Sequence, residues 1–305
     1  EAYRTLHTLD LDILFFTDLG MNANEFLLPL FRSAPIQMTG WGIPHTSGIK
    51  EIDYYITSTE LEPPEAQINY TETLVRLPGG LPCCFQKPGE QQYMALPRDY
   101  FILPPGDTLV GCLQGLHKLH PDYDLILEEI AIKNPEVGFV FVEDELASRS
   151  QIFLDRLAKT APSVRERCVF LAIIKRHEYQ ALCNCVDLLL DPIYYGSGIT
   201  FFEASFVGTP IVTMEGKNLR TRVVACGYRE MGIDDAPITK TKEEYIELVT
   251  TLVNAPERRK RMRASILANN HRVFNRMDHI RSFERFCLHA VKIERHRDHD
   301  HPEDS

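Results

Sequence analysis

One stretch of the sequence limits the possible folds more than any other. An apolar run at 187–191 is followed by a glycine loop at 195–198, a short helical segment that ends at Pro210, and a second apolar run at 211–214. A strand, a glycine loop, a helix and another strand in this order predict a βαβ unit. Because such a unit needs two parallel strands, we expect an α/β protein with a parallel sheet.

The glycine loop has two interpretations. Gly196 and Gly198 allow the backbone to approach a ligand, and the helix start offers free N–H groups and a positive dipole end, which suits a phosphate. Glu203, one turn further on, could then hold the hydroxyls of a ribose. Alternatively, Thr200 and Glu203 form a capping box, which satisfies the first N–H groups of the helix without any ligand. Both interpretations stay open at this point.

Strand and helix patterns alternate along most of the chain. Further strands are expected at 12–18, 35–41, 52–56, 73–77, 108–113, 137–142 and 168–171, with a short one near Pro237. Helices are expected at 21–32, 63–70, 121–133, 148–160, 177–185, 242–254, 256–269 and 278–295, and another from Leu219. This alternation predicts two Rossmann-like lobes with parallel sheets and a ligand cleft at the carboxyl ends of their strands. The loops after Asp18, Trp41, Leu113 and Asp191 should therefore face one another.

The predicted division between the lobes follows a change in composition. Residues 78–107 are rich in Pro and Gly, which is typical of a connecting segment. We expect an N-terminal lobe at 1–105, a C-terminal lobe at 106–276, a helix at 277–296 that returns to the first lobe, and a charged, disordered tail at 297–305. The first lobe is expected to be incomplete, because little sequence precedes its first strand.

Composition excludes several classes of partner. The net charge of −10 argues against nucleic acid as a main partner, and no apolar run approaches the ~18 residues of a membrane span. No signal peptide is visible at the start, so we expect a cytoplasmic protein, or a nuclear one, whose eight cysteines are reduced thiols. The cysteines at 83, 84, 183 and 185 lack the spacing of a metal site, and no metal site is predicted.

Three segments carry a resemblance to a known family. Residues 34–48 (APIQMTGWGIPHTSG) with 52–56 (IDYYI), residues 114–121 around Lys118, and residues 196–216 followed by Arg222 resemble the protein O-N-acetylglucosaminyltransferase and SPINDLY-like family. The resemblance runs from about Asp12 to about Phe286. It implies the two-lobed GT-B fold and an inverting sugar transfer that needs no metal or other cofactor.

The resemblance also implies roles for individual residues. Lys118 would hold the diphosphate of a nucleotide sugar and stabilise the leaving group. His45 and Asp18 are candidates for the general base. Expected donor contacts are Gln114, Arg176, Tyr179, Gly196, Ser197, Gly198, Ile199, Thr200 and Glu203 in the second lobe, and Gly42, Pro44 and Thr46 in the first.

Several positions depart from the family pattern. A His-Thr pair of the animal transferase is Gly198 and Ile199 here, its ribose aspartate is Glu203, and a histidine near the base is Tyr179. Its glutamine before the lysine is Gly115, with Gln114 one residue away. The sequence thus predicts an inverting transferase that moves N-acetylglucosamine from a UDP-sugar to a Ser or Thr hydroxyl of a protein. The alternatives are another donor such as GDP-fucose, glucosylation of asparagine, a catalytically silent nucleotide-sugar-binding module, and an interaction protein without a ligand.

Structural roles are open for the same residues. Lys118 could be a solvated lysine, and His45 a loop histidine whose ring nitrogens contact the backbone. Arg222 is interpreted as a brace for a helix, and His117 and His120 as surface residues. The basic run at 258–263 is interpreted as a solvated helix face.

Overall fold

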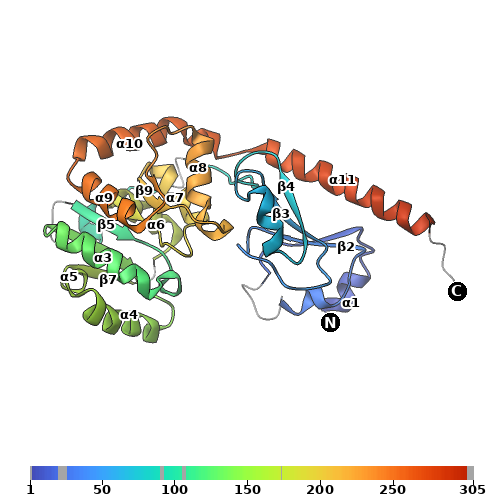
Figure 1. Cartoon of the computed structure of the whole chain (residues 1–305), viewed down its shortest axis with the longest axis horizontal. Coiled ribbons are helices and arrows are strands. Elements are labelled where there is room, and N and C mark those ends of the chain that lie inside the picture. Colours follow the sequence, from blue (N-terminus) through green and yellow to red (C-terminus); the bar gives the residue numbers. More distant parts are fainter. Residues whose placement is uncertain (1, 20–25, 90–92, 105–107, 173, 301–305) are drawn as a thin grey trace. The chain divides into compact units, whose positions relative to one another are not determined.

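The structure is a computed structural model that describes residues 2–19, 26–89, 93–104, 108–172 and 174–300, without the side chains of residues 2, 3, 176 and 297–300. Its contacts divide the chain into two compact units. The first unit comprises Glu1–Cys84 with Arg276–Ser305, and the second comprises Phe85–Asn275. Figure 1 shows the elements of each unit.

The first unit contains a parallel sheet in the order β1-β2-β3-β4. Its strands are β1 (Ile13–Phe16), β2 (Ile36–Gly40), β3 (Tyr54–Ser58) and β4 (Thr73–Leu77). Helix α1 (Ala2–His7) and two 3₁₀ helices, η1 (Leu28–Leu30) and η2 (Pro64–Asn69), complete this part of the chain. Residues of β2 are buried along its whole length, as expected of a central parallel strand.

Helix α11 (Met277–Asp300) packs on this sheet. The ring of Phe283 lies edge-on to Phe15 at 5.3 Å, and Phe286 lies edge-on to Tyr54 at 5.2 Å. Because 277–300 contains no Gly or Pro, the helix continues to Asp300. Residues 297–300 are therefore helical, contrary to the prediction of a disordered tail, and 301–305 lie outside the described residues.

The second unit contains a six-stranded parallel sheet in the order β10-β9-β8-β5-β6-β7. Its strands are β5 (Thr108–Cys112), β6 (Val137–Val142), β7 (Cys168–Leu171), β8 (Leu188–Leu190), β9 (Ile211–Met214) and β10 (Ile238–Thr239). The strand order reverses between β5 and β8, which makes this the topological switch point where open α/β sheets bind ligands. The predicted α/β fold with parallel sheets is confirmed.

The α-helices of the second unit lie around this sheet (Figure 1). They are α3 (Pro121–Lys133), α4 (Ala147–Thr160), α5 (Pro162–Glu166), α6 (Arg176–Cys185), α7 (Ile199–Val207), α8 (Val223–Met231), α9 (Lys242–Val253) and α10 (Pro256–Asn269), among the described residues. The 3₁₀ helices are η4 (Arg98–Tyr100), η5 (Leu116–Lys118), η6 (Leu219–Thr221) and η7 (Asn270–Arg272). His120 is exposed and caps α3, since its Nδ1 accepts a hydrogen bond of 3.1 Å from the Asp122 N–H.

Four sequence predictions differ from the structure in local detail. Of the helix expected at 21–32, residues 21–25 lie outside the described residues and 28–30 form a 3₁₀ turn that contains Pro29. The helix at 63–70 is a 3₁₀ helix, and the helix from Leu219 begins as a 3₁₀ turn before α8. The division between the units falls at 84/85 rather than 105/106, because Phe85 stacks on Phe202 at 4.5 Å.

The basic run at 258–263 is only partly a solvated face. Lys260 and Arg261 are exposed, but Arg259 donates hydrogen bonds to the carbonyls of Leu252 (2.7 Å) and Val253 (2.6 Å) at the end of α9. A cation at a helix C-terminus satisfies carbonyls that have no partner within the helix. The predicted solvated face is therefore confirmed for Lys260 and Arg261 and wrong for Arg259.

The prediction for the cysteines is confirmed, because all eight are free thiols. Among the described residues, none of the helices is long and apolar enough to cross a membrane. The same part of the chain holds no cluster of three or more His, Cys, Asp or Glu side chains with the geometry of a metal site.

Candidate functional site

Gln114 joins the loops that follow β5 and β8 at the switch point. Its Nε2 donates hydrogen bonds to Ser197 Oγ (3.0 Å) and Thr200 Oγ1 (2.8 Å). Its Oε1 accepts one from Lys118 Nζ (2.9 Å), and the same ammonium donates to the Gly196 carbonyl at 3.2 Å. The structure therefore brings together five residues that the sequence assigned to donor binding.

Lys118 is half-buried rather than freely solvated. It ends η5, and its Nζ lies 4.8 Å from the centre of the Tyr195 ring. Burial lowers the pKa of Lys118, and the nearby Asp191 carboxylate opposes that change. An ammonium has three N–H donors, and two of them contact Gln114 and Gly196. The third has no partner among the described residues, so it is available to an anionic ligand.

The start of α7 tests the capping-box interpretation of the glycine loop. Gly198 is the N-cap of this helix, with no hydrogen bond from a capping side chain. Thr200 is therefore the second residue inside the helix, and its hydroxyl accepts a hydrogen bond from Gln114. The capping box expected from Thr200 and Glu203 is not formed, because the helix begins two residues earlier than that interpretation requires. Glu203 is buried, at 6% exposure.

The two glycines of the loop lie in different surroundings. A Cβ on Gly196 would lie 2.5 Å from Asp191 Oδ2, so this position is limited by packing inside the unit. A Cβ on Gly198 would meet nothing within 4 Å. Ile199 beside it is 59% exposed. Space therefore lies open above Gly198, where a ligand could approach the backbone.

Helix α6 supplies the remaining predicted residues of the second unit. Tyr179 donates a hydrogen bond from its hydroxyl to the Leu113 carbonyl at 3.0 Å, next to Gln114. Burial, with Cys183 and the Glu203 carboxylate, raises the pKa of Tyr179 well above its usual value. Arg176 begins the helix, but its side chain lies outside the described residues.

A second group of predicted residues lies in the first unit, on the loops after β1 and β2. A Cβ on Gly42 would lie 2.0 Å from the Thr17 carbonyl, so these loops touch and a larger residue does not fit. Asp18 is exposed on the first loop, and its Oδ1 accepts a hydrogen bond of 3.2 Å from Thr17 Oγ1. Packing thus explains Gly42, and its contact with a sugar stays a prediction.

Residues 44–48 are held by Glu72, which the sequence did not single out. The buried Glu72 carboxylate accepts hydrogen bonds from Thr46 Oγ1 (2.6 Å) and from the Ser47 N–H (2.7 Å) and hydroxyl. Burial alone raises the pKa of Glu72, but the hydrogen bonds from Ser47 and Thr46 outweigh it, and the pKa is lowered. Thr46 therefore has a structural partner, and Pro44 beside it is half-buried.

His45 is exposed at the middle of this loop. Its Nδ1 lies 2.7 Å from the Thr46 carbonyl. A carbonyl can only accept, so Nδ1 carries a proton in this contact, and in the neutral ring the lone pair is then on Nε2. The backbone contact expected of a loop histidine is present, and in the neutral ring Nε2 is the nitrogen that could act as a base.

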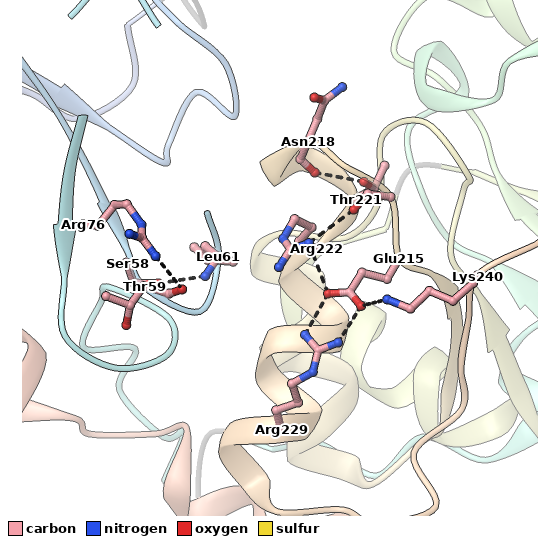
Figure 2. Close-up of polar contacts among 11 residues, drawn as sticks. Ser58, Thr59, Leu61, Arg76, Glu215, Asn218, Thr221, Arg222, Arg229 and Lys240 are labelled. Atoms are coloured by element: carbon pink, nitrogen blue, oxygen red, sulfur yellow. Dashed lines mark hydrogen bonds and ion pairs between the residues drawn. The ribbon is translucent and has the colours of Figure 1, made fainter. Parts of the chain in front are cut away.

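Glu215 follows β9 and gathers three cations (Figure 2). Arg229 donates to its carboxylate at 2.7 and 2.5 Å, Lys240 contacts it closely, and Arg222 lies 3.5 Å away. Burial raises the pKa of Glu215, but hydrogen bonds from Arg229 and Lys240 outweigh it and lower the pKa to about 2. Arg222 is the N-cap residue of α8, so its ion pair with Glu215 links the start of that helix to the loop after β9, as expected of a brace.

Sequence reasoning missed Glu72 and Asp191 as residues that hold the two loops. Asp191 had a usable signal, because it is a carboxylate directly after a buried strand at the switch point. Glu72 had none, because its partners Thr46 and Ser47 are distant in the sequence.

Comparison with known proteins places the chain among sugar transferases. A model of the family described as Glycosyl transferase family 41 matches residues 90–283. The chain is 26% identical over 228 residues to a protein of Solanum lycopersicum named probable UDP-N-acetylglucosamine–peptide N-acetylglucosaminyltransferase SPINDLY. The aligned region covers 73% of this chain and 24% of that protein. It is 25% identical over 266 residues to the Arabidopsis thaliana protein of the same title named SEC, which covers 83% of this chain and 26% of that protein. The chain spans about a quarter of the length of these curated relatives.

Solved structures agree on the fold. A Thermobaculum terrenum O-GlcNAc transferase mutant aligns with a TM-score of 0.76 at 24% identity, over 95% of this chain and 55% of that chain. Anabaena HepE in complex with UDP and glucose aligns with a TM-score of 0.63 at 12% identity, over 95% of this chain and 80% of that one. Both are GT-B glycosyltransferases, so the predicted fold class is confirmed, as is the resemblance read from the three sequence segments.

Proposed function

Because the chain belongs to glycosyl transferase family 41, we propose that it transfers a sugar from a nucleoside-diphosphate donor to a protein. The donor is proposed to be UDP-N-acetylglucosamine and the acceptor a Ser or Thr hydroxyl, in line with the names of the SPINDLY and SEC relatives. One observation carries the proposal: a half-buried lysine and an open glycine loop meet at the switch point of the second unit.

In the proposed reaction, the second unit stabilises the departing nucleotide. The bond between the anomeric carbon and the diphosphate oxygen breaks, and negative charge develops on that oxygen. The Lys118 ammonium supplies a positive charge in a partly desolvated place, where it stabilises such charge better than it would in water. The first N–H groups of α7 add the positive end of the helix dipole. We assign this task to these groups and include no metal in the proposal.

The first unit is proposed to activate the acceptor. His45 is the preferred base, because its contact with the Thr46 carbonyl places the proton of the neutral ring on Nδ1 and leaves the lone pair on Nε2. Nε2 would take the hydroxyl proton while the oxygen attacks the anomeric carbon from the side opposite the leaving diphosphate. Asp18, on the neighbouring loop, is the second candidate. That these residues face the donor across a cleft stays a prediction.

Calorimetric titration with UDP and, separately, with GDP tests the donor site. We expect UDP to bind, and Lys118→Ala to weaken binding about 10- to 100-fold, the size of one charge-assisted hydrogen bond. Lys133→Ala is the matched control, because Lys133 is an exposed lysine paired with Glu129 on α3, and it should change nothing. Binding of GDP instead would change the sugar donor and keep the reaction class.

Donor hydrolysis separates an enzyme from a silent module. Nucleotide binding together with slow release of the sugar from the donor supports a transferase. Binding without any release of sugar favours a nucleotide-sugar-binding module. The replacement of the family's His-Thr pair by Gly198 and Ile199 is compatible with that alternative. If neither nucleotide binds, the transferase proposal fails for this chain.

A further inference from the structure

Asp191 is the most enclosed charged group at the switch point. It directly follows β8 and is 2% exposed. Its Oδ1 accepts hydrogen bonds from the Ser197 N–H (2.7 Å) and hydroxyl (2.8 Å), and its Oδ2 accepts one from the Thr213 hydroxyl (2.8 Å). All three groups act as donors, so the geometry fits an ionised carboxylate. Burial raises the pKa of Asp191, and the bonds from Ser197 and Thr213 oppose that rise.

These contacts set the direction of a chain of hydrogen bonds. The single hydroxyl proton of Ser197 is given to Asp191, so Ser197 Oγ must accept from Gln114 Nε2. The other end of the Gln114 amide is then the oxygen, which accepts from Lys118. If the Gln114 amide were reversed, its NH₂ group would face the ammonium and repel it. A buried carboxylate thus decides which atom of Gln114 faces Lys118.

The Lys118 ammonium has few other groups to orient it. The groups near it are the Cys112 thiol of β5, the His117 ring of η5, the Tyr195 ring and Asp191. Asp191 is the carboxylate in this set. Two N–H groups of Lys118 are fixed by Gln114 and Gly196, and this fixes the direction of the third.

We propose that Asp191 is a positioning residue for Lys118. Through Ser197 and Gln114 it fixes where the ammonium points, and its buried negative charge keeps that ammonium protonated. The proposal rests on the donor-binding role of Lys118 proposed above, and it adds a residue that does not itself touch the donor. A purely structural Asp191 would hold the loop but would leave the ionisation of Lys118 unchanged.

Two variants separate the charge of Asp191 from its geometry. In Asp191→Asn the side-chain oxygen can still accept from Ser197, and the hydroxyl of Thr213 can turn to accept from the new NH₂ group, so mainly the charge is lost. In Ser197→Ala the charge stays, but the link to Gln114 is cut. Thr213→Val is the matched control, because it removes a donor from the same carboxylate outside the path to Lys118.

The first readout is the NMR titration of the Lys118 side-chain carbon in the whole 305-residue chain, assigned with Lys118→Ala. Loss of the opposite charge should move the midpoint in Asp191→Asn about one pH unit lower than in wild type, while Thr213→Val should titrate like wild type. The second readout is UDP titration, in which Ser197→Ala should bind about tenfold more weakly and Thr213→Val within twofold of wild type.

An unchanged Lys118 midpoint in Asp191→Asn, or equal UDP affinities of Ser197→Ala and Thr213→Val, overturns the proposal. If circular dichroism shows that Asp191→Asn does not fold, the comparison of Ser197→Ala with Thr213→Val decides alone. Failure of wild type to bind UDP or GDP refutes the proposed function instead. The NMR midpoints then still show whether Asp191 controls Lys118.

Discussion

Replacement of Glu215 by Gln tests how much the cation cluster of Figure 2 stabilises the second unit. The lowering of the Glu215 pKa from 4.5 to about 2 corresponds to roughly 3 kcal/mol at neutral pH. The partners are more open to solvent, since the side chain of Arg229 is 41% exposed and that of Lys240 is 64% exposed. Screening reduces the contribution, and we expect Glu215→Gln to lower the free energy of unfolding by about 2 kcal/mol at pH 7.

The pH dependence gives the sign of the effect. The folded-state pKa of Glu215 is below its unfolded value, so the carboxylate stabilises the fold above about pH 4.5, and this stabilisation is lost as the pH falls toward 2. The difference between wild type and Glu215→Gln should therefore shrink between pH 5 and pH 3. The assay is urea denaturation followed by far-ultraviolet circular dichroism at several pH values.

Glu257→Gln is the matched control for this substitution. Glu257 pairs with Lys260 on α10, and both side chains are 72% exposed, so we expect a change below about 0.5 kcal/mol. The reasoning is refuted if Glu215→Gln is no more destabilising than this control. It is also refuted if the loss caused by Glu215→Gln stays constant down to pH 3.

Two further predictions compare pairs of similar positions. Gly196→Ala should lower the free energy of unfolding by about 2–3 kcal/mol and weaken UDP binding, because the new Cβ would lie 2.5 Å from the tightly held Asp191 carboxylate. Gly198→Ala has open space around it and should lower the free energy of unfolding by less than about 1 kcal/mol. Thermal melts and UDP titration of both variants check this. Phe283→Ala should lower the free energy of unfolding in chemical denaturation by about 2–3 kcal/mol, because the Phe283 ring packs on the first sheet. The control is Leu288→Ala, whose side chain is 66% exposed on the same helix, and equal stability of the two variants would contradict the packing of α11.

Elements with a strong local pattern were predictable from the sequence. Strands β4, β6, β7 and β9 and helices α3 and α10 have the predicted bounds, because Gly, Pro and polar residues end each apolar pattern sharply. The Pro- and Gly-rich connection was recognised as irregular. Its composition could not say which unit Phe85 would join, because that depends on the distant ring of Phe202.

The candidate site was predictable where it depended on backbone order, and not where it depended on side-chain partners. Lys118, Gln114 and Ser197 come together because the loops after β5 and β8 must meet at the switch point. The capping box was wrong because the pair Thr200 and Glu203 fits the pattern but does not fix where the helix begins. Partners such as Glu72 for Thr46 become visible only when β4 pairs beside β3.

The first unit is assembled from two pieces of chain that are separated by the whole second unit. A ribosome releases Phe85–Asn275 before it releases α11, so the second unit can close on itself while the first sheet still lacks the helix that covers Phe15 and Tyr54. Contacts between residues so far apart in the sequence also form slowly. In synthesis, an element made after the second unit therefore completes the first sheet, and until then the rings of Phe15 and Tyr54 lack the helix that covers them.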